Sequence, residues 1–344
     1  MPSVSYKLGG GFFPMTTRTR YFVITSLLVL TIGIGTGLLA YYVGGPGGLL
    51  VDQDGPEELQ YVPRDAAVVA YADVREIMTS EVREKIRRAV PLPGNGQAQF
   101  QDQTGINIEF DIDHVVASLQ QLADGTTAGL VIARGRFNNV KIEALMREHG
   151  AQVEDYNGKR LIENHDIPHQ VGDTLALTFL EPGLVAVGSG RGVRAAIDLQ
   201  KGGENVTSNA ELMNLMRSMD RGNAWTLGRL DVLRAGGRLP PQIANQLPAI
   251  TWFSVSSRID GDISGTVRAD TRDDEAANNL RDVVRGFLAL AKLQAGTRPE
   301  LQTMVRSLEL GGTGKSVVLS FSIPGAVFDA FGAKSESAEK PPAH

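Results

Sequence analysis

The chain contains no cysteine among its 344 residues. This excludes zinc sites with thiolate ligands, iron–sulfur clusters, cysteine nucleophiles and disulfides. A lipid anchor attached through cysteine is excluded as well. The fold must therefore be held together by the burial of apolar side chains.

Basic residues are too few in most of the chain for a nucleic-acid partner. The formal net charge is −5, yet Lys7, Arg18 and Arg20 are the only charged residues before Val43, so everything beyond carries −8. Binding to a phosphate backbone requires a basic surface. We expect no nucleic-acid partner.

Long hydrophobic runs are also scarce, since the mean hydropathy of −0.09 excludes a protein with many membrane spans. One run stands out: Tyr21 to Val43 contains 23 residues without a charge. At about 1.5 Å per residue it can cross a hydrocarbon core of about 30 Å. The sequence predicts a transmembrane helix over residues 21–43.

The charges around this run predict its orientation. Three cations precede it, whereas the first charges after it are acidic, beginning with Asp52. The positive-inside rule then places residues 1–20 in the cytoplasm and the domain beyond residue 43 outside the inner membrane. A cleaved signal peptide is the alternative, but its apolar region is shorter, so an uncleaved single-pass anchor is favoured.

Gly33 and Gly37 form a GxxxG spacing inside this run. Such spacing allows close approach of two membrane helices, so these glycines are a possible helix-pairing face. Glycine is common in membrane helices, and the incidental interpretation is favoured.

Two segments lack the periodicity of folded structure. Residues 44–60 are rich in glycine, proline and acids and are predicted to be a flexible linker. Residues 333–344 carry almost no apolar side chains and are predicted to be a disordered tail. The folded part is expected to begin near Tyr61.

Between these segments, β-hairpins recur. The dipeptides Asp124-Gly125 and Asp260-Gly261 each separate two strand-like runs, suit type I′ turns and precede an amphipathic helix. Gly129 and Gly265 stand at the same distance beyond the two turn glycines. We interpret this as an internal repeat of a β-β-α-β-β-α module, with one unit at 61–240 and another at 241–332.

Because hairpins dominate, the predicted fold class is α+β with mostly antiparallel sheets, following the N-terminal transmembrane helix. The first unit is predicted to carry insertions, which are a strand at Ala66 to Ala72, a helix from about Ser80 to Val90, a hairpin turning on Asn157-Gly158, and a helix with a capping box formed by Ser208 and Glu211.

Residues 311–316, GGTGKS, resemble the end of a phosphate-binding loop. The first glycine of that motif would fall on Glu309, and an alternating strand pattern rather than a helix follows. We therefore expect a turn between two strands.

Other candidate sites also favour structural interpretations. A metal site at His165, Asp166 and His169 lacks a further ligand at a suitable spacing, so a solvated loop is expected. Asp111 and Asp113 lack the glycine and spacing of a calcium loop, and Asp273, Asp274 and Glu275 suit a helix N-terminus. A basic run suits a solvated helix face; it consists of Arg83, Lys85, Arg87 and Arg88. An apolar stripe suits a core; it consists of Leu212, Met213, Leu215, Met216 and Met219.

The run from Tyr61 to Tyr71, YVPRDAAVVAY, follows the predicted anchor and precedes the repeated hairpins. It resembles uncharacterised bacterial single-pass membrane-anchored extracytoplasmic proteins with a domain of unknown function. The resemblance implies a location but no activity and no functional residue.

These observations predict a membrane-anchored module that binds a protein partner or has a structural role outside the cytoplasm, without catalysis and without a cofactor. The alternative is a carrier of a lipid or another apolar ligand, in a cavity lined by phenylalanines. The candidates for that lining are Phe179, Phe253, Phe287 and Phe321.

Overall fold

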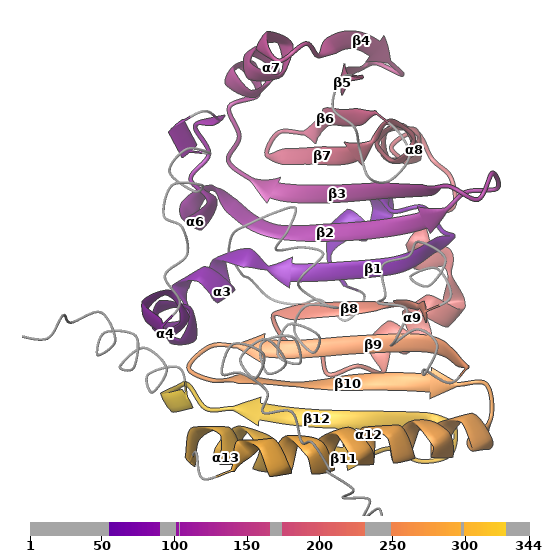
Figure 1. Cartoon of the computed structure of the whole chain (residues 1–344). Helices are drawn as coiled ribbons and strands as arrows, with labels where there is room; N and C mark the ends of the chain where they lie inside the picture. The colour runs from indigo at the N-terminus through magenta and orange to yellow at the C-terminus, as the bar shows by residue number, and fades with distance from the viewer. Residues whose placement is uncertain are drawn as a thin grey trace, which may run out of the picture.

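A computed structural model describes residues 55–89, 101–102, 104–165, 174–230, 249–296 and 299–327. It is an α+β structure built on one antiparallel sheet of twelve strands, in the order β11-β12-β10-β9-β8-β1-β2-β3-β7-β6-β5-β4 (Figure 1). The predicted fold class is confirmed at this level.

The strands are β1 (Ala66–Asp73), β2 (Ile112–Gln121), β3 (Thr127–Gly135), β4 (Gln152–Tyr156), β5 (Lys159–Asn164), β6 (Leu175–Glu181), β7 (Leu184–Ser189), β8 (Ala224–Arg229), β9 (Ile250–Ile259), β10 (Ile263–Thr271), β11 (Glu309–Gly311) and β12 (Ser316–Ile323). The helices are η1 (Glu57–Tyr61), α3 (Val74–Thr79), α4 (Glu81–Ala89), α6 (Ile108–Asp111), α7 (Asn139–Glu148), α8 (Gly190–Leu199), η2 (Val206–Ser208), α9 (Ala210–Arg217), α12 (Asp274–Ala295) and α13 (Pro299–Arg306).

Two hairpins turn differently from the prediction. A type I′ turn needs positive φ at both central residues, but neither Asp124 nor Asp260 has positive φ. The loop after β2 is longer, and the Asp124 carboxylate accepts a hydrogen bond from the Thr126 backbone N–H at 2.9 Å. This side-chain contact stabilises the loop instead. At the hairpin between β4 and β5, Asn157, at φ 57°, and Gly158, at φ 82°, both have the positive φ of a type I′ turn.

Successive side chains of each strand point to opposite faces of the sheet. Val69 and Tyr71 of β1 define the first face, which η1, α8 and α9 cover over the N-terminal half of the sheet. Ala70 and Ala72 define the second face, where α3 and α7 pack. Through the strand register, the second face also carries Val317, onto which α12 packs.

The methionine-rich stripe is part of the core, as predicted. Leu212, Met213 and Met216 of α9 are buried in the cluster on the first face, and Trp225 of β8 lies in the same cluster. Trp252 is partly buried, and its Nε1 donates to Glu211 at 2.8 Å.

The predicted capping box is not the cap of α9. Ser208 is the last residue of η2, and Asn209 is the N-cap, its side chain accepting from the Leu212 backbone N–H at 3.2 Å. At α12, Asp273 caps the helix by accepting from Ala276 N–H at 2.8 Å, which confirms the capping interpretation.

The folded part includes residues before the predicted boundary at Tyr61, because Glu57–Tyr61 form η1 and Leu59 is 1% exposed. The predicted span at 21–43, with Gly33 and Gly37, lies outside the described residues, as do the tails at 1–20 and 333–344. Among the residues that the structure does describe, no helix is both long and apolar enough to cross a bilayer.

Candidate functional site

A buried charged cluster joins η1 to the sheet. Glu58 of η1 is 1% exposed, and its carboxylate accepts a hydrogen bond from Nε of Arg134, on β3. Nε2 of His114, from β2, lies 2.9 Å from the other oxygen. His114 and Arg134 are register partners on adjacent strands, so the sheet places both under η1. The cluster ties the start of the folded chain to the two strands.

The electrostatics of this cluster favour an ionised Glu58. Burial alone would raise the pKa of Glu58, but hydrogen bonds and charge from His114, together with a hydrogen bond from Arg134, outweigh it and lower the pKa to about 2. A carboxylate so strongly paired is a poor proton donor or acceptor near neutral pH. The arrangement suits a structural role.

Aromatic rings extend the cluster across the first face. The ring of Tyr71 lies 5.8 Å from that of Trp225 in a stacked arrangement and 5.8 Å from the His114 ring. Burial raises the pKa of the Tyr71 hydroxyl, with the charges of Asp73 and Glu58 acting in the same direction. These groups reinforce a packed interior.

A cavity of about 380 Å³ opens between the turn before β1 and the C-terminal end of α8. Its polar groups are largely paired with one another or with neighbours. Arg64 pairs with Glu204, and Asp198 accepts from Asn157 Nδ2 at 2.6 Å. The full lining is Pro63, Arg64, Asp65, Ala195, Asp198, Leu199, Gly202 and Glu204. The run YVPRDA thus contributes one wall of this cavity.

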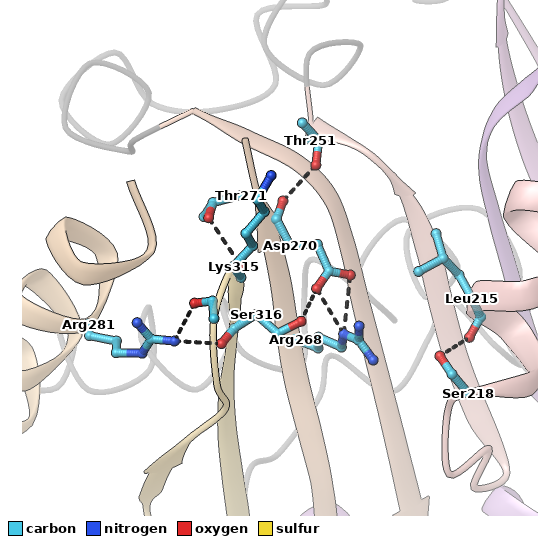
Figure 2. Close-up of polar contacts among 10 residues, drawn as sticks. Leu215, Ser218, Thr251, Arg268, Asp270, Thr271, Arg281, Lys315 and Ser316 are labelled. Atoms are coloured by element: carbon cyan, nitrogen blue, oxygen red, sulfur yellow. Dashed lines mark hydrogen bonds and ion pairs between the residues drawn. The ribbon is translucent and has the colours of Figure 1, made fainter. Parts of the chain in front are cut away.

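The segment that resembles a phosphate-binding loop is a turn between β11 and β12, as predicted (Figure 2). Arg281 of α12 donates through Nη2 to the carbonyl oxygens of Gly314, at 2.7 Å, and Ser316, at 2.9 Å. The backbone N–H and hydroxyl of Thr271 both donate to the Lys315 carbonyl at 2.9 Å. These bonds fix the turn against α12 and β10.

Nearby, Asp270 connects two strands. Both of its carboxylate oxygens lie 3.1 Å from Nε of Arg268, and the Ser316 hydroxyl donates to one of them (Figure 2). Its backbone carbonyl accepts from the Thr251 hydroxyl at 2.8 Å. The carboxylate and carbonyl of Asp270 both have partners within the protein, so this cluster also connects neighbouring strands.

The exposed apolar surface is concentrated on α12. Phe287, Leu290 and Leu293 are 52%, 53% and 79% exposed, and we call these three residues the α12 ridge. Residues spaced by three on a helix line up as a ridge that fits the groove of another helix. Ala277 and Leu280, nearer the N-terminus of the same helix, pack on the sheet. Of the large apolar side chains that are exposed in the described residues, the others are Phe110 and Val140.

Several of the other sequence candidates have partners within the protein. Asp113 pairs with Arg75, Asp111 accepts from the Asn107 backbone N–H, and Arg83 pairs with Glu109. In the metal hypothesis, Asp166 and His169 lie outside the described residues. Across the residues that the structure does describe, there is no group of three or more potential metal ligands.

The phenylalanines proposed to line a ligand cavity do not converge. Phe179, Phe253 and Phe321 belong to three different core clusters, and Phe287 is exposed on the α12 ridge. None of the four lines the cavity beside α8.

A scan against protein-family models, a search of curated proteins and a search of solved structures each found no match to this chain.

Proposed function

We propose that this protein is a non-enzymatic interaction module, anchored in the inner membrane by residues 21–43, that binds a protein partner outside the cytoplasm. The α12 ridge is the observation that carries this proposal. Contiguous exposed apolar side chains on a soluble domain mark surfaces that bind other molecules. The charged clusters at Glu58 and Asp270 are engaged within the protein, which suits a rigid scaffold more than a reaction centre.

We also propose that the sheet is a duplicated β-β-α-β-β-α module. Strand order supports this, because reading outward from the central β1–β8 pair gives β1-β2-β3-β7-β6 on one side and β8-β9-β10-β12-β11 on the other. In each direction a helix follows the third of these strands, α7 in one half and α12 in the other. The hairpin of β4 and β5 then extends the first half.

Crosslinking in intact cells, followed by mass spectrometry, tests the interaction. We expect replacement of Phe287, Leu290 and Leu293 by serine to abolish crosslinks between α12 and partner proteins. Val140→Ser is the matched control, because Val140 is 82% exposed on a different helix, α7. Unchanged crosslinks from α12 in the triple variant would refute the proposal.

The location is tested separately. Protease added to spheroplasts should digest the domain beyond residue 43 and leave residues 1–20 protected. Protection of the large domain would overturn the proposed orientation.

A further inference from the structure

The hairpin of β4 and β5 closes on Asn157-Gly158, at one end of the sheet (Figure 1). Both residues are exposed, and Asn157 is the one residue other than glycine with positive φ in the described part of the chain. Asparagine is a thermolabile residue, and a following glycine makes it more so, because glycine has no side chain to hinder attack by its backbone nitrogen. The turn therefore carries a dipeptide that is prone to deamidation.

Deamidation needs water and no enzyme. The backbone nitrogen of Gly158 loses its proton and bonds to the side-chain carbonyl carbon of Asn157, and the side-chain nitrogen leaves as ammonia. Water then opens the resulting ring, which leaves aspartate or isoaspartate at position 157. In both products a neutral amide has become a carboxylate. The reaction thus requires a free Gly158 N–H and a side-chain amide that can turn toward it.

In the closed hairpin both reacting groups are held by other partners. The Gly158 N–H donates to Oδ1 of Asp155 at 3.1 Å. The Asn157 amide donates through Nδ2 to Oδ1 of Asp198, on α8, at 2.6 Å, and its oxygen accepts from Nζ of Lys201 at 3.1 Å. Because the ring cannot close while these contacts persist, the reaction has to start from an opened hairpin.

The product cannot restore the same contacts. A carboxylate at position 157 has no N–H for Asp198, so two carboxylates would meet in place of the hydrogen bond. Lys201 can still bond to the new carboxylate, which offsets part of this repulsion. Asp198 also accepts from the Tyr156 hydroxyl at 3.1 Å, so one carboxylate of α8 holds two residues of the hairpin. Isoaspartate lengthens the backbone of the two-residue turn and disrupts its geometry as well.

We propose that Asn157 is a deamidation site that the closed hairpin protects, and that deamidation after opening permanently loosens the contact between this hairpin and α8. The inference is independent of the proposed function, because the α12 ridge belongs to a helix that packs near the opposite end of the sheet.

Mass spectrometry of the full-length protein tests the protection. The protein in detergent is kept at mildly alkaline pH, either native or unfolded in guanidinium, and the tryptic peptide of residues 148–159 is followed over time. We expect Asn157 to deamidate at least about tenfold more slowly in the native chain, because slow chemistry follows the fraction of open hairpin. Equal rates in the native and unfolded chains would overturn the proposal.

Two variants identify the protecting contacts. Asp198→Ala removes the acceptor on α8, and Asp155→Ala removes the acceptor within the turn. Each should speed deamidation of the native chain by about fivefold, the effect of one hydrogen bond, after normalisation to the unfolded chain. Asp282→Ala, which removes an exposed carboxylate from α12, is the control. An unchanged rate in both Asp198→Ala and Asp155→Ala would refute protection by these contacts.

The consequence of deamidation is tested with substitutions at position 157. Asn157→Asp supplies the product carboxylate, whereas Asn157→Gly removes the amide without adding charge and still permits positive φ. Hydrogen exchange of residues 152–164 should be about fivefold faster in Asn157→Asp than in the natural chain, with Asn157→Gly in between. Exchange in Asn157→Asp as slow as in the natural chain would overturn the loosening of the hairpin.

A charge exchange isolates the contact with Asp198. Asn157→Asp combined with Asp198→Asn reverses the two ends of the hydrogen bond and should restore the slow exchange. If the double variant exchanged as fast as Asn157→Asp alone, repulsion from Asp198 would be refuted as the cause.

Discussion

The first face of the sheet has opposite characters in its two halves. Leu130 and Ile132 of β3 are 3% and 0% exposed under the helices of the N-terminal half. At the same distances beyond the turn glycine of the second hairpin, β10 has Thr266 and Arg268. The second face keeps its residue types, with Ala133 in β3 matched by Ala269 in β10.

This difference shows that one strand framework tolerates two kinds of surface. In the C-terminal half, hydroxyl groups follow the register from β9 across β12 on the first face. These residues are Ser254, Ser256, Ser264, Thr266, Ser316, Ser320 and Ser322. Hydrophobic burial holds the N-terminal half of this face, while the C-terminal half relies on α12 and α13 on the other face.

The largest loss of folding stability is expected from a substitution in the charged cluster of the N-terminal half. Glu58→Ala leaves Arg134 and His114 without their partner beneath η1, and removal of one member of a buried ion pair costs about 3–5 kcal/mol. Asp270→Ala, in the partly exposed cluster of the C-terminal half, should cost about 1 kcal/mol. Urea unfolding of both variants measures the difference, and equal losses would refute the contrast between the halves.

The pH dependence of stability should follow from Glu58. Its folded pKa of about 2 lies below the ordinary value of 4.5, so its stabilising effect is complete above pH 4.5 and is lost as pH falls toward 2. A shift of this size corresponds to about 3 kcal/mol. Urea unfolding between pH 2 and 5 should show this slope in the natural chain and a weaker slope in Glu58→Ala.

Exchange of matched residues tests the comparison directly. Leu130→Thr removes apolar contacts and buries a hydroxyl group, so it should destabilise the protein by about 3 kcal/mol. Thr266→Leu, at the matched position of β10, breaks only the 3.0 Å contact with the Ser256 hydroxyl and should cost about 1 kcal/mol. Thermal unfolding of the two variants compares them. A larger loss from Thr266→Leu would mean that the hydroxyl-lined face is packed as tightly as the apolar one.

The contribution of Asp73 to the pH dependence of stability should have the opposite sign to that of Glu58. It is 4% exposed at the end of β1, and burial raises its pKa to about 6, although a hydrogen bond from the Glu76 backbone N–H opposes the shift. Because the folded state holds this proton more tightly, stability falls as pH rises from about 4 to 6. Asp73→Asn keeps a capping side chain and should be more stable than the natural chain by about 1–2 kcal/mol at pH 7. Equal stability of the two chains at pH 7 would contradict the raised pKa.

The local elements were largely predictable from the sequence, whereas their partners were not. Alternation and helical spacing indicated the hairpins around 124–125 and 260–261 and the helices after them, because these patterns are local. The pairing of β1 with β8 joins distant residues, and no local pattern encodes it. The Glu58 cluster was missed for the same reason, although His114 beside two valines and Arg134 in an apolar strand were available as signals.

On α12 the sequence showed an apolar stripe that included Phe287 and Leu288 together with Leu280 and Ala291. Those residues cover about 100° of the helix circumference, which is the width of one buried face, so the pattern alone predicts that all of them pack on the sheet. The structure departs from this at Phe287, because Leu280 is buried whereas Phe287, seven residues later on the same side of the helix, is exposed.

The smallest effect concerns α9, one of the helices that keeps the first face apolar in the N-terminal half. Asn209→Ala removes the side chain that accepts from the Leu212 backbone N–H, and loss of an N-cap costs about 1 kcal/mol. Ser208→Ala removes only a hydroxyl that donates to the Asn205 carbonyl at the protein surface, so it should change stability by less than about 0.5 kcal/mol. Thermal unfolding of both variants decides between the observed cap and the capping box that the sequence predicted. A larger loss of stability from Ser208→Ala would mean that Ser208, and not Asn209, is the N-cap of α9.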